Sequence, residues 1–152
     1  MAPILFSEEM SQWFQSFAKK MVLRLVTKVG WEAQSTDGHL STLLREIMIG
    51  LVCTFAYDDG LVVKEASTWF AAFQADANDV QSLPSDMRTS VFKIVHKNGG
   101  AKEYEAVKTY FYTAETSAER KHVLSSLGST PDPKLKLATL EWAASGEIKL
   151  QD

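Results

Sequence analysis

The stretch LPSDMRTSVFKIVHKNGGAKEYEAVKTYFYTAETSAERKHVLSSLG, residues 83–128, decides the fold class of this chain. Apolar residues recur in it every three or four positions, which is the spacing that lines one face of an α-helix. Ser85 or Asp86 has the side chain and the place of a helix N-cap, and Gly99 marks the end of that helix. The stretch is therefore predicted to be helical, with breaks, from its beginning to its end.

Further helix boundaries lie within this stretch and around it. Thr116 and Glu119 have the spacing of a capping box, in which each side chain bonds the other residue's backbone N–H. Ser7, followed by two glutamates, predicts another helix start, and the last helix is predicted from Asp132 to Ser145.

The same helical spacing runs along the rest of the chain. The apolar rows outside the first stretch are Met10, Trp13, Phe14, Phe17, Met21, Val22, Leu25, Val26 and Val29; Leu40, Leu43, Leu44, Ile47, Met48, Leu51 and Phe55; Val62, Ala66, Trp69, Phe70 and Phe73; and Leu135, Ala138, Leu140 and Trp142. We predict an all-α protein of about seven helices, without strands, in which neighbouring helices bury these rows against one another.

The spacing of the helix starts predicts how the helices are arranged. Starts near Ser85, Ser117 and Asp152 lie 32 and 35 residues apart, with one helix break midway in each interval. This is the period of helix–turn–helix repeats that stack into a superhelix. We therefore predict a single α-helical repeat domain over residues 1–152, an α–α superhelix of the HEAT or armadillo kind. A plain helical bundle is the alternative.

The composition limits the kinds of partner. The chain has 152 residues, of which 45% are hydrophobic, and a net charge of −3, which argues against a basic nucleic-acid-binding surface. Its single cysteine, Cys53, excludes an internal disulfide and is typical of a reducing compartment. No apolar run approaches the length of a membrane span, so we expect no membrane partner and a cytoplasmic location.

A search for catalytic motifs finds none that is complete. Zinc hydrolases of the His-Glu-x-x-His type place two histidines four residues apart on one helix face, a spacing that His39, His96 and His122 do not have. We expect these three to be ordinary surface or capping histidines. Ser16 and Lys19 match a Ser-x-x-Lys motif, but its companion motifs are absent. We assign no catalytic and no metal-binding residue to the chain.

Two other residue types are better explained by a place in the core. Cys53 lies in the apolar run IGLVCTF, so a buried, inert thiol is expected. The tryptophans Trp13, Trp31, Trp69 and Trp142 occur at helical spacing and are expected in the core rather than on a stacking surface.

Several stretches, taken in order, carry a resemblance to a known family. They are VGWEAQSTDGHLSTLLREIMIGLV (29–52), the Leu-Pro-x-Asp-x-Arg start and Gly-Gly of 83–100, TSAERKHVLSSLG (116–128) and SGEIKLQD (145–152). The chain resembles the C-terminal helical domain of gluzincin (thermolysin-like) zinc aminopeptidases of the puromycin-sensitive and endoplasmic-reticulum type. The positions that match the family pattern are Trp31, His39, Leu40, Arg45, Arg88, Gly128, Pro133 and Gly146. We interpret most of these positions as packing, capping or turn residues.

The resemblance implies a role without catalysis. In that family the C-terminal domain is a superhelix of paired helices, which closes over the zinc-bearing domain and forms a bowl for peptide substrates. The zinc motif and the Gly-x-Met-Glu-Asn element lie upstream in a different domain, and neither occurs here. We therefore expect no cofactor in this chain, zinc in the parent's catalytic domain, and that domain and peptides as partners.

Three basic residues are candidate contacts for a peptide or for another domain. Arg45, Arg88 and Lys97 could pair with a peptide carboxylate, and an arginine offers a planar fork for such a pair. Ordinary surface salt bridges explain the three equally well.

The family domain continues beyond SGEIKLQD, so we expect the chain to be a piece of a larger domain, with Asp152 as the cap of a further helix. A superhelix that stops between repeats exposes an apolar face. We therefore expect self-association through the C-terminal end, or a rearranged last helix. The alternative function is a stand-alone helical-repeat module that binds a protein partner.

Overall fold

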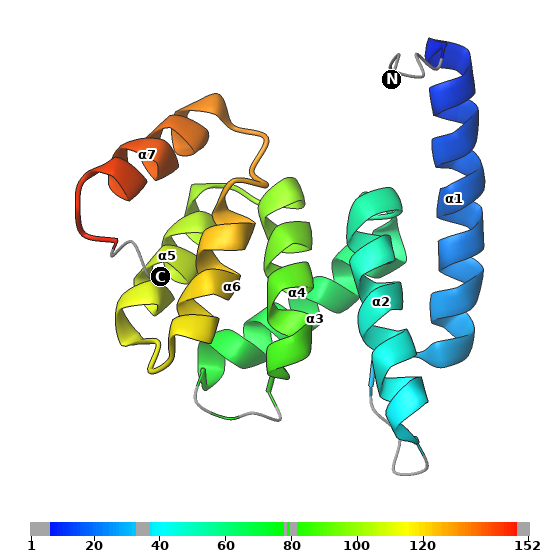
Figure 1. Cartoon of the computed structure of the whole chain (residues 1–152), viewed down its shortest axis with the longest axis horizontal. Helices are drawn as coiled ribbons and strands as arrows, with labels where there is room; N and C mark the ends of the chain where they lie inside the picture. The colour runs from blue at the N-terminus through cyan, green and yellow to red at the C-terminus, as the bar shows by residue number, and fades with distance from the viewer. Residues whose placement is uncertain (1–6, 33–36, 78, 80–81, 149–152) are drawn as a thin grey trace, which may run out of the picture. The chain divides into compact units, whose positions relative to one another are not determined.

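The computed structural model describes residues 7–32, 37–77, 79 and 82–148 of the chain (Figure 1). Within these residues lie seven α-helices and no β-strand. The helices are α1 (Glu8–Val29), α2 (His39–Phe55), α3 (Gly60–Ala75), α4 (Ser85–Asn98), α5 (Ala101–Thr113), α6 (Ser117–Leu127) and α7 (Pro133–Ala144). The prediction of an all-α fold with about seven helices is confirmed.

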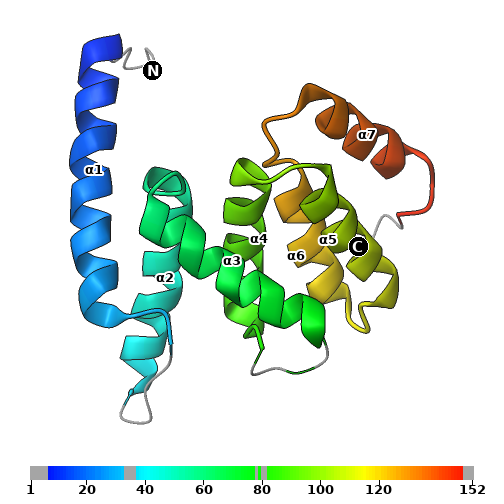
Figure 2. The same cartoon turned by 180° about the vertical axis from the view of Figure 1, so that it is seen from behind.

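The chain divides into two compact units, Met1–Ala56 and Tyr57–Asp152, which we call the N-terminal unit and the C-terminal unit. The N-terminal unit consists of α1 and α2, which lie side by side as an antiparallel pair in both views (Figures 1 and 2). Val22 and Val26 of α1 are buried, as are Met48 and Val52 of α2. Cys53 is also buried, as predicted.

The C-terminal unit is organised around α4. This helix packs against α3, α5 and α6, and its residues Val91, Phe92 and Ile94 are fully enclosed. Aromatic rings extend the core across three helices, because Phe73 of α3 lies 5.1 Å from Phe92 and 4.8 Å from Tyr110 of α5, measured between ring centroids. Edge-to-face packing of this kind adds to the stabilisation from burial.

The predicted caps of α1 and α6 are confirmed. Ser7 Oγ accepts a hydrogen bond from the Met10 N–H at 3.3 Å. Thr116 Oγ1 accepts from the Glu119 N–H at 3.2 Å, and Glu119 Oε2 accepts from the Thr116 N–H at 3.3 Å. Gly30 ends α1 with a φ of 74°, which only glycine adopts without strain.

The predicted cap of α4 is wrong. This helix begins at Ser85 itself, and its N-cap is Pro84, whose side chain cannot accept a hydrogen bond. The Pro84 carbonyl accepts instead from the Met87 N–H at 3.0 Å. The proline ring restricts φ, and Pro84 has the extended ψ of 141° that an N-cap requires, so the backbone sets this start.

The last helix is held mainly by one side chain. Trp142 is buried against Phe111 of α5, with ring centroids 4.9 Å apart, and its Nε1 donates to Tyr112 Oη at 2.9 Å. The predicted burial of the apolar rows is wrong for Leu140 of α7, which is 67% exposed. It is also wrong for much of the rows of α1 and α2, where Trp13 is 67% and Leu40 is 80% exposed. The predicted cap at Asp152 lies outside the described residues, and the superhelical stacking of a single repeat domain stays a prediction.

In the described part of the chain, no single helix is long and apolar enough to cross a membrane. The consecutive helices α2 and α3 reach that length and composition only when they are taken together as a bent pair.

Candidate functional site

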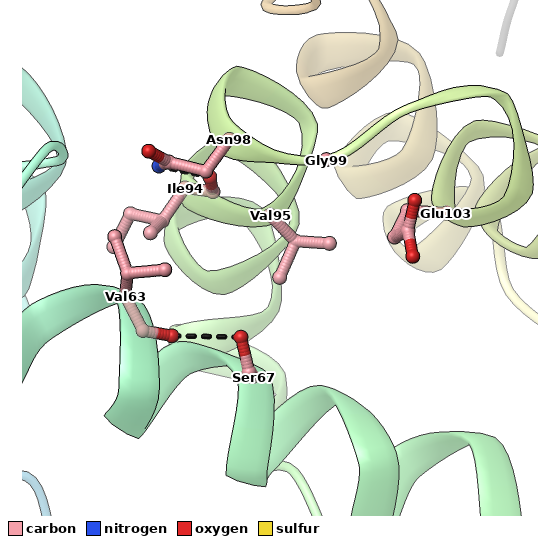
Figure 3. Close-up of a pocket in the computed structure, with 7 residues that line it drawn as sticks. All are labelled: Val63, Ser67, Ile94, Val95, Asn98, Gly99 and Glu103. Atoms are coloured by element: carbon pink, nitrogen blue, oxygen red, sulfur yellow. Dashed lines mark hydrogen bonds between the residues drawn. The ribbon is translucent and has the colours of Figure 1, made fainter. Parts of the chain in front are cut away.

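A pocket opens in the C-terminal unit where α3, α4 and the start of α5 meet (Figure 3). Its volume is about 210 Å³. Its lining residues are Val63, Ser67, Ile94, Val95, Asn98, Gly99 and Glu103. Three of these have polar side chains and three have branched apolar ones, so the pocket has both apolar walls and polar atoms.

The polar hydrogens of Ser67 and Asn98 already have acceptors within the protein. Ser67 Oγ donates to the Val63 carbonyl at 2.7 Å, one turn earlier on α3 (Figure 3). Asn98 Nδ2 donates to the carbonyls of Ile94 and Tyr57, both at 2.8 Å. The Ser67 hydroxyl oxygen and the Asn98 amide oxygen therefore remain as hydrogen-bond acceptors.

Glu103 adds a negative charge to this lining. Its Oε2 accepts a hydrogen bond from the Gly100 N–H at 2.9 Å, and this bond lowers the pKa of the carboxyl group. Gly99 makes the close approach of Glu103 to α4 possible. A Cβ atom at Gly99 would lie 2.8 Å from the Val95 carbonyl oxygen and 3.0 Å from the Glu103 side chain. The pocket therefore presents acceptors and a carboxylate, and it suits a ligand rich in N–H groups with an apolar body.

The three histidines are placed differently from one another. His39 is exposed at the start of α2, and His122 is half-buried, with Nδ1 2.6 Å from Thr89 Oγ1. His96 is enclosed in the core of the C-terminal unit, where its Nδ1 lies 3.0 Å from the Ser126 carbonyl oxygen. The prediction of surface or capping histidines is therefore wrong for His96. Burial lowers the pKa of His96, and the Ser126 hydrogen bond opposes this only in part.

Arg88 of α4 is enclosed as well, at 3% exposure. Its Nη1 donates to Tyr110 Oη at 2.6 Å and to Glu119 Oε1 at 2.7 Å, and its Nε donates to the Leu83 carbonyl at 3.1 Å. The guanidinium carbon also lies 5.5 Å from the centre of the Phe73 ring. Arg88 therefore joins α4 to α5 and α6 through charge-assisted hydrogen bonds.

The ionisation of the partners of Arg88 fits this arrangement. Burial raises the pKa of Tyr110 to about 12, so its hydroxyl stays neutral. Burial would also raise the pKa of Glu119, but hydrogen bonds to Thr116 and Tyr110 and the charge of Arg88 together lower it. Arg88 and Glu119 thus form an ion pair, and the hydrogen bonds of Arg88 to Tyr110 and of Glu119 to Thr116 fix its geometry.

Arg45 and Lys97 lie in different units. Arg45 of α2 is buried, and its Nη2 bonds Asp37 Oδ2 at 2.5 Å. Lys97 of α4 is half-buried, with Nζ 4.0 Å from the centre of the Tyr57 ring, in a cation–π contact. The structure places Lys97 on the same helix as Arg88, and peptide contact by any of the three stays a prediction.

The remaining family-pattern residues lie mostly at helix ends. Gly128 and Pro133 are the C-cap of α6 and the first residue of α7, and Gly146 has a φ of 85° just after α7. His39 and Leu40 begin α2, and Trp31 is half-buried two residues after α1. The pocket residues Ser67, Asn98 and Glu103 were not anticipated. Only the Gly99-Gly100 pair before Glu103 could have indicated a close backbone approach.

The zinc that the resemblance implies has no ligand set in the described ranges. No group of three or more His, Cys, Asp or Glu side chains there is close enough to hold a metal ion. Ser16 of α1 is exposed, and Lys19, one turn later, is half-buried. The described side chains can bind and pack, and we derive no reaction step from them.

The helical fold and the order of its motifs agree with one protein family. The family model described as the ERAP1-like C-terminal domain matches residues 3–152, and the chain belongs to this family. The family resemblance expected from the sequence is confirmed.

Curated relatives are aminopeptidases. The chain is 31% identical over 128 residues to Aminopeptidase M1 of Arabidopsis thaliana, a match of 82% of this chain and 14% of that protein. It is 30% identical over 129 residues to Aminopeptidase M1-A of Oryza sativa subsp. japonica, with 82% and 14% coverage. It is 28% identical over 145 residues to Aminopeptidase 2, mitochondrial, of Saccharomyces cerevisiae, with 95% and 15% coverage. The chain spans about one seventh of the length of these relatives.

Proposed function

We propose that the chain is a non-catalytic part of the C-terminal helical domain of a zinc aminopeptidase and helps to shape the peptide chamber of that parent enzyme. The observation that carries this proposal is the family match over residues 3–152, on a chain in which every described element is a helix. The partner would be the parent's catalytic domain, which would hold the zinc. The superhelical arrangement of the helix pairs belongs to the same proposal.

The pocket between α3, α4 and α5 supports contact with peptides. The Ser67 hydroxyl oxygen and the Asn98 amide oxygen in its lining can accept hydrogen bonds, and Glu103 carries a negative charge. An ammonium or guanidinium group on a peptide would provide the donors that these atoms lack, while its methylene groups would pack against Val63 and Val95. The pocket would thus hold a basic part of a bound peptide.

Among the three basic candidates, Lys97 is the one we retain as a peptide or interdomain contact. It is half-buried, so part of it can be reached from solvent. Arg45 and Arg88 are enclosed and paired with Asp37 and Glu119, so contact with a peptide carboxylate would first require those pairs to break. We propose that these two arginines support the fold instead.

We propose a cytoplasmic location. The support is the single, buried Cys53, which is the pattern of a protein kept in a reducing compartment.

A chimera tests the proposed function. The segment of Arabidopsis Aminopeptidase M1 that matches this chain would be deleted, or replaced by the chain, and hydrolysis of aminoacyl reporters and of longer peptides would be measured. We expect the deletion to lower kcat/KM by about 100-fold, because a chamber that is not closed positions peptides poorly. The replacement should recover most of this loss.

The control is a replacement by an unrelated helical segment of the same length, which should recover nothing. A correctly folded chimera that is no better than this control would contradict the proposal. So would hydrolysis by the isolated chain with added zinc that disappears in a Ser16→Ala variant.

A second candidate function is a stand-alone module that binds a protein partner. It is favoured by one observation, the large apolar side chains that α1 and α2 leave exposed to solvent.

A further inference from the structure

The pocket of the C-terminal unit has the size of a site for one side chain. Its volume of about 210 Å³ lies below the roughly 300 to 1,000 Å³ of pockets that hold whole small molecules. Its walls come from α3, from α4, from Gly99 and from the first turn of α5, all within one compact unit. The pocket is therefore formed by a single core, and it can accept a group from one residue of a larger ligand.

The lining changes from apolar to charged across the pocket. Figure 3 shows the Val95 side chain between Val63 on one side and the Glu103 carboxylate on the other. Val95 is buried and Val63 is half-buried, so together they provide an apolar wall. A ligand that lies across Val95 therefore needs an apolar part that is followed by a group able to pair with a carboxylate.

The carboxylate of Glu103 is fixed in place and is still able to bind a cation. Its Oε2 accepts from the Gly100 N–H, whereas a carboxylate offers roughly four acceptor positions. No lysine or arginine of the described residues lies within ion-pair distance of it. Hydrogen bonds from the backbone lower the pKa of Glu103, so this carboxylate is charged at neutral pH. A cationic group from outside the chain would supply the missing counter-charge.

A lysine side chain matches this lining better than the amino terminus of a peptide does. A terminal ammonium group has a peptide carbonyl oxygen close beside it, and that oxygen is another acceptor. Near the pocket it would meet the oxygens of Ser67 and Asn98, which need donors. A lysine ammonium group instead follows a stem of methylene groups, which can pack against Val63 and Val95.

An arginine side chain also matches less well than lysine. A guanidinium group binds a carboxylate best when it donates to both oxygens at once. At Glu103 one of these oxygens, Oε2, already accepts from the Gly100 N–H. The lysine ammonium group is a compact charge that needs only one of the two oxygens.

We propose that this pocket is a subsite for one lysine side chain of a bound peptide, with the methylene stem on Val63 and Val95 and the ammonium group at Glu103. The inference rests on the proposed function, because it takes the ligand to be a peptide, and it specifies which residue type the peptide contributes. Glu103 determines the specificity, since its charge distinguishes lysine from an uncharged side chain of the same shape.

NMR titration of the isotope-labelled full chain with short peptides tests the proposal. The probes are acetyl-Ala-Lys-Ala-amide, the same peptide with norleucine or arginine at the centre, and Ala-Ala-Ala-amide with a free amino terminus. We expect the lysine peptide to give saturable shifts of the Gly99 and Gly100 amides. Its affinity should be about tenfold higher than that of the norleucine peptide and of the free amino terminus, because a bond to a charged group is lost in both.

Two matched glutamate variants test the role of Glu103. Glu103→Gln keeps an acceptor for the Gly100 N–H but removes the charge, and it should lower the affinity for the lysine peptide about tenfold. The control is Glu105→Gln, which changes an exposed carboxylate of α5 outside the pocket lining and should leave the affinity unchanged. Circular dichroism checks that both variants keep their helices.

The chimera with Aminopeptidase M1 separates this inference from the proposed function. The substrates are two long peptides that carry lysine or norleucine away from the cleaved amino terminus. The ratio of their kcat/KM values should favour lysine, fall with Glu103→Gln and stay with Glu105→Gln. An active chimera without a preference for lysine would refute the subsite and support the proposed function. An inactive chimera, with a chain that still binds the lysine peptide, would refute the proposed function and support the subsite.

Four results of the titration would overturn the proposal. These are no saturable binding of the lysine peptide, equal binding of the lysine and norleucine peptides, tighter binding of the arginine peptide or of the free amino terminus, and an unchanged affinity in the Glu103→Gln variant.

Discussion

One side chain from each unit shows that polarity alone does not decide which residues of this protein are buried. In the C-terminal unit a charged side chain, Arg88, is enclosed at 3% exposure, whereas in the N-terminal unit an aromatic one, Trp13, is 67% exposed. Arg88 is enclosed because Glu119, Tyr110 and backbone carbonyls accept its hydrogen bonds. Trp13 is exposed because no described helix of its own unit covers that side of α1. Burial therefore depends on which partners the fold supplies, and residue type alone does not decide it.

The largest expected effect follows from removing the enclosed charge of Arg88. An Arg88→Met variant leaves the Glu119 carboxylate and the Leu83 carbonyl without their donor, and we expect a loss of about 3 to 5 kcal/mol in the free energy of unfolding. Urea denaturation followed by circular dichroism measures it. Arg88→Lys, which keeps the charge but not the fork, should lose less. A loss below about 1 kcal/mol for Arg88→Met would mean that the hydrogen bonds are not important for stability.

The same substitution made in both units sharpens the comparison. Phe92→Ala removes a fully enclosed ring and should cost about 3 to 4 kcal/mol, whereas Phe17→Ala removes a half-exposed ring and should cost about 0.5 kcal/mol or less. Urea denaturation of the two variants under the same conditions compares the losses directly. Equal losses would mean that Phe17 packs in the folded protomer as closely as Phe92 does.

The smallest expected effect is a dependence of stability on pH in the C-terminal unit. Burial lowers the pKa of His96 below its ordinary value of 6.5, so the unfolded chain binds more protons at this side chain than the folded chain does. The stability from neutral His96 is complete above pH 6.5 and is lost as the pH falls through the folded-state pKa.

Urea midpoints about one pH unit above and about one below 6.5 measure this loss. A His96→Asn variant should show a smaller difference between the two midpoints. His122, whose pKa burial also lowers, is unchanged in that variant, so the comparison reports on His96. Equal pH dependence in both chains would contradict the expectation.

Local sequence signals predicted the helices and most of their ends. The capping box of Thr116 and Glu119, the Ser7 cap and the glycine after α1 all act through contacts within one helical turn, so a pattern of nearby residues is sufficient to find them. The start of α4 was missed because the restricted backbone of Pro84 replaced a side-chain cap there.

The candidate pocket could not be predicted in the same way. Ser67, Asn98 and Glu103 come from three helices, and none belongs to a motif with a fixed spacing. Their chemistry as acceptors follows from bonds to Val63, Tyr57 and Gly100, which only the packed structure supplies. The enclosed His96 was missed for the same reason, since its partner at Ser126 is 30 residues away in the chain.

By itself, the sequence determined that this protein is helical, where most of its helices begin and end, and to which family it belongs. These properties depend on short-range periodicity, on caps and on the order of motifs. Only the tertiary structure decided which apolar rows are covered, which charged groups are enclosed, and where acceptors converge on a pocket. The physical reason is that burial and hydrogen bonding between helices depend on residues far apart in the chain, and their positions are fixed only when the helices pack.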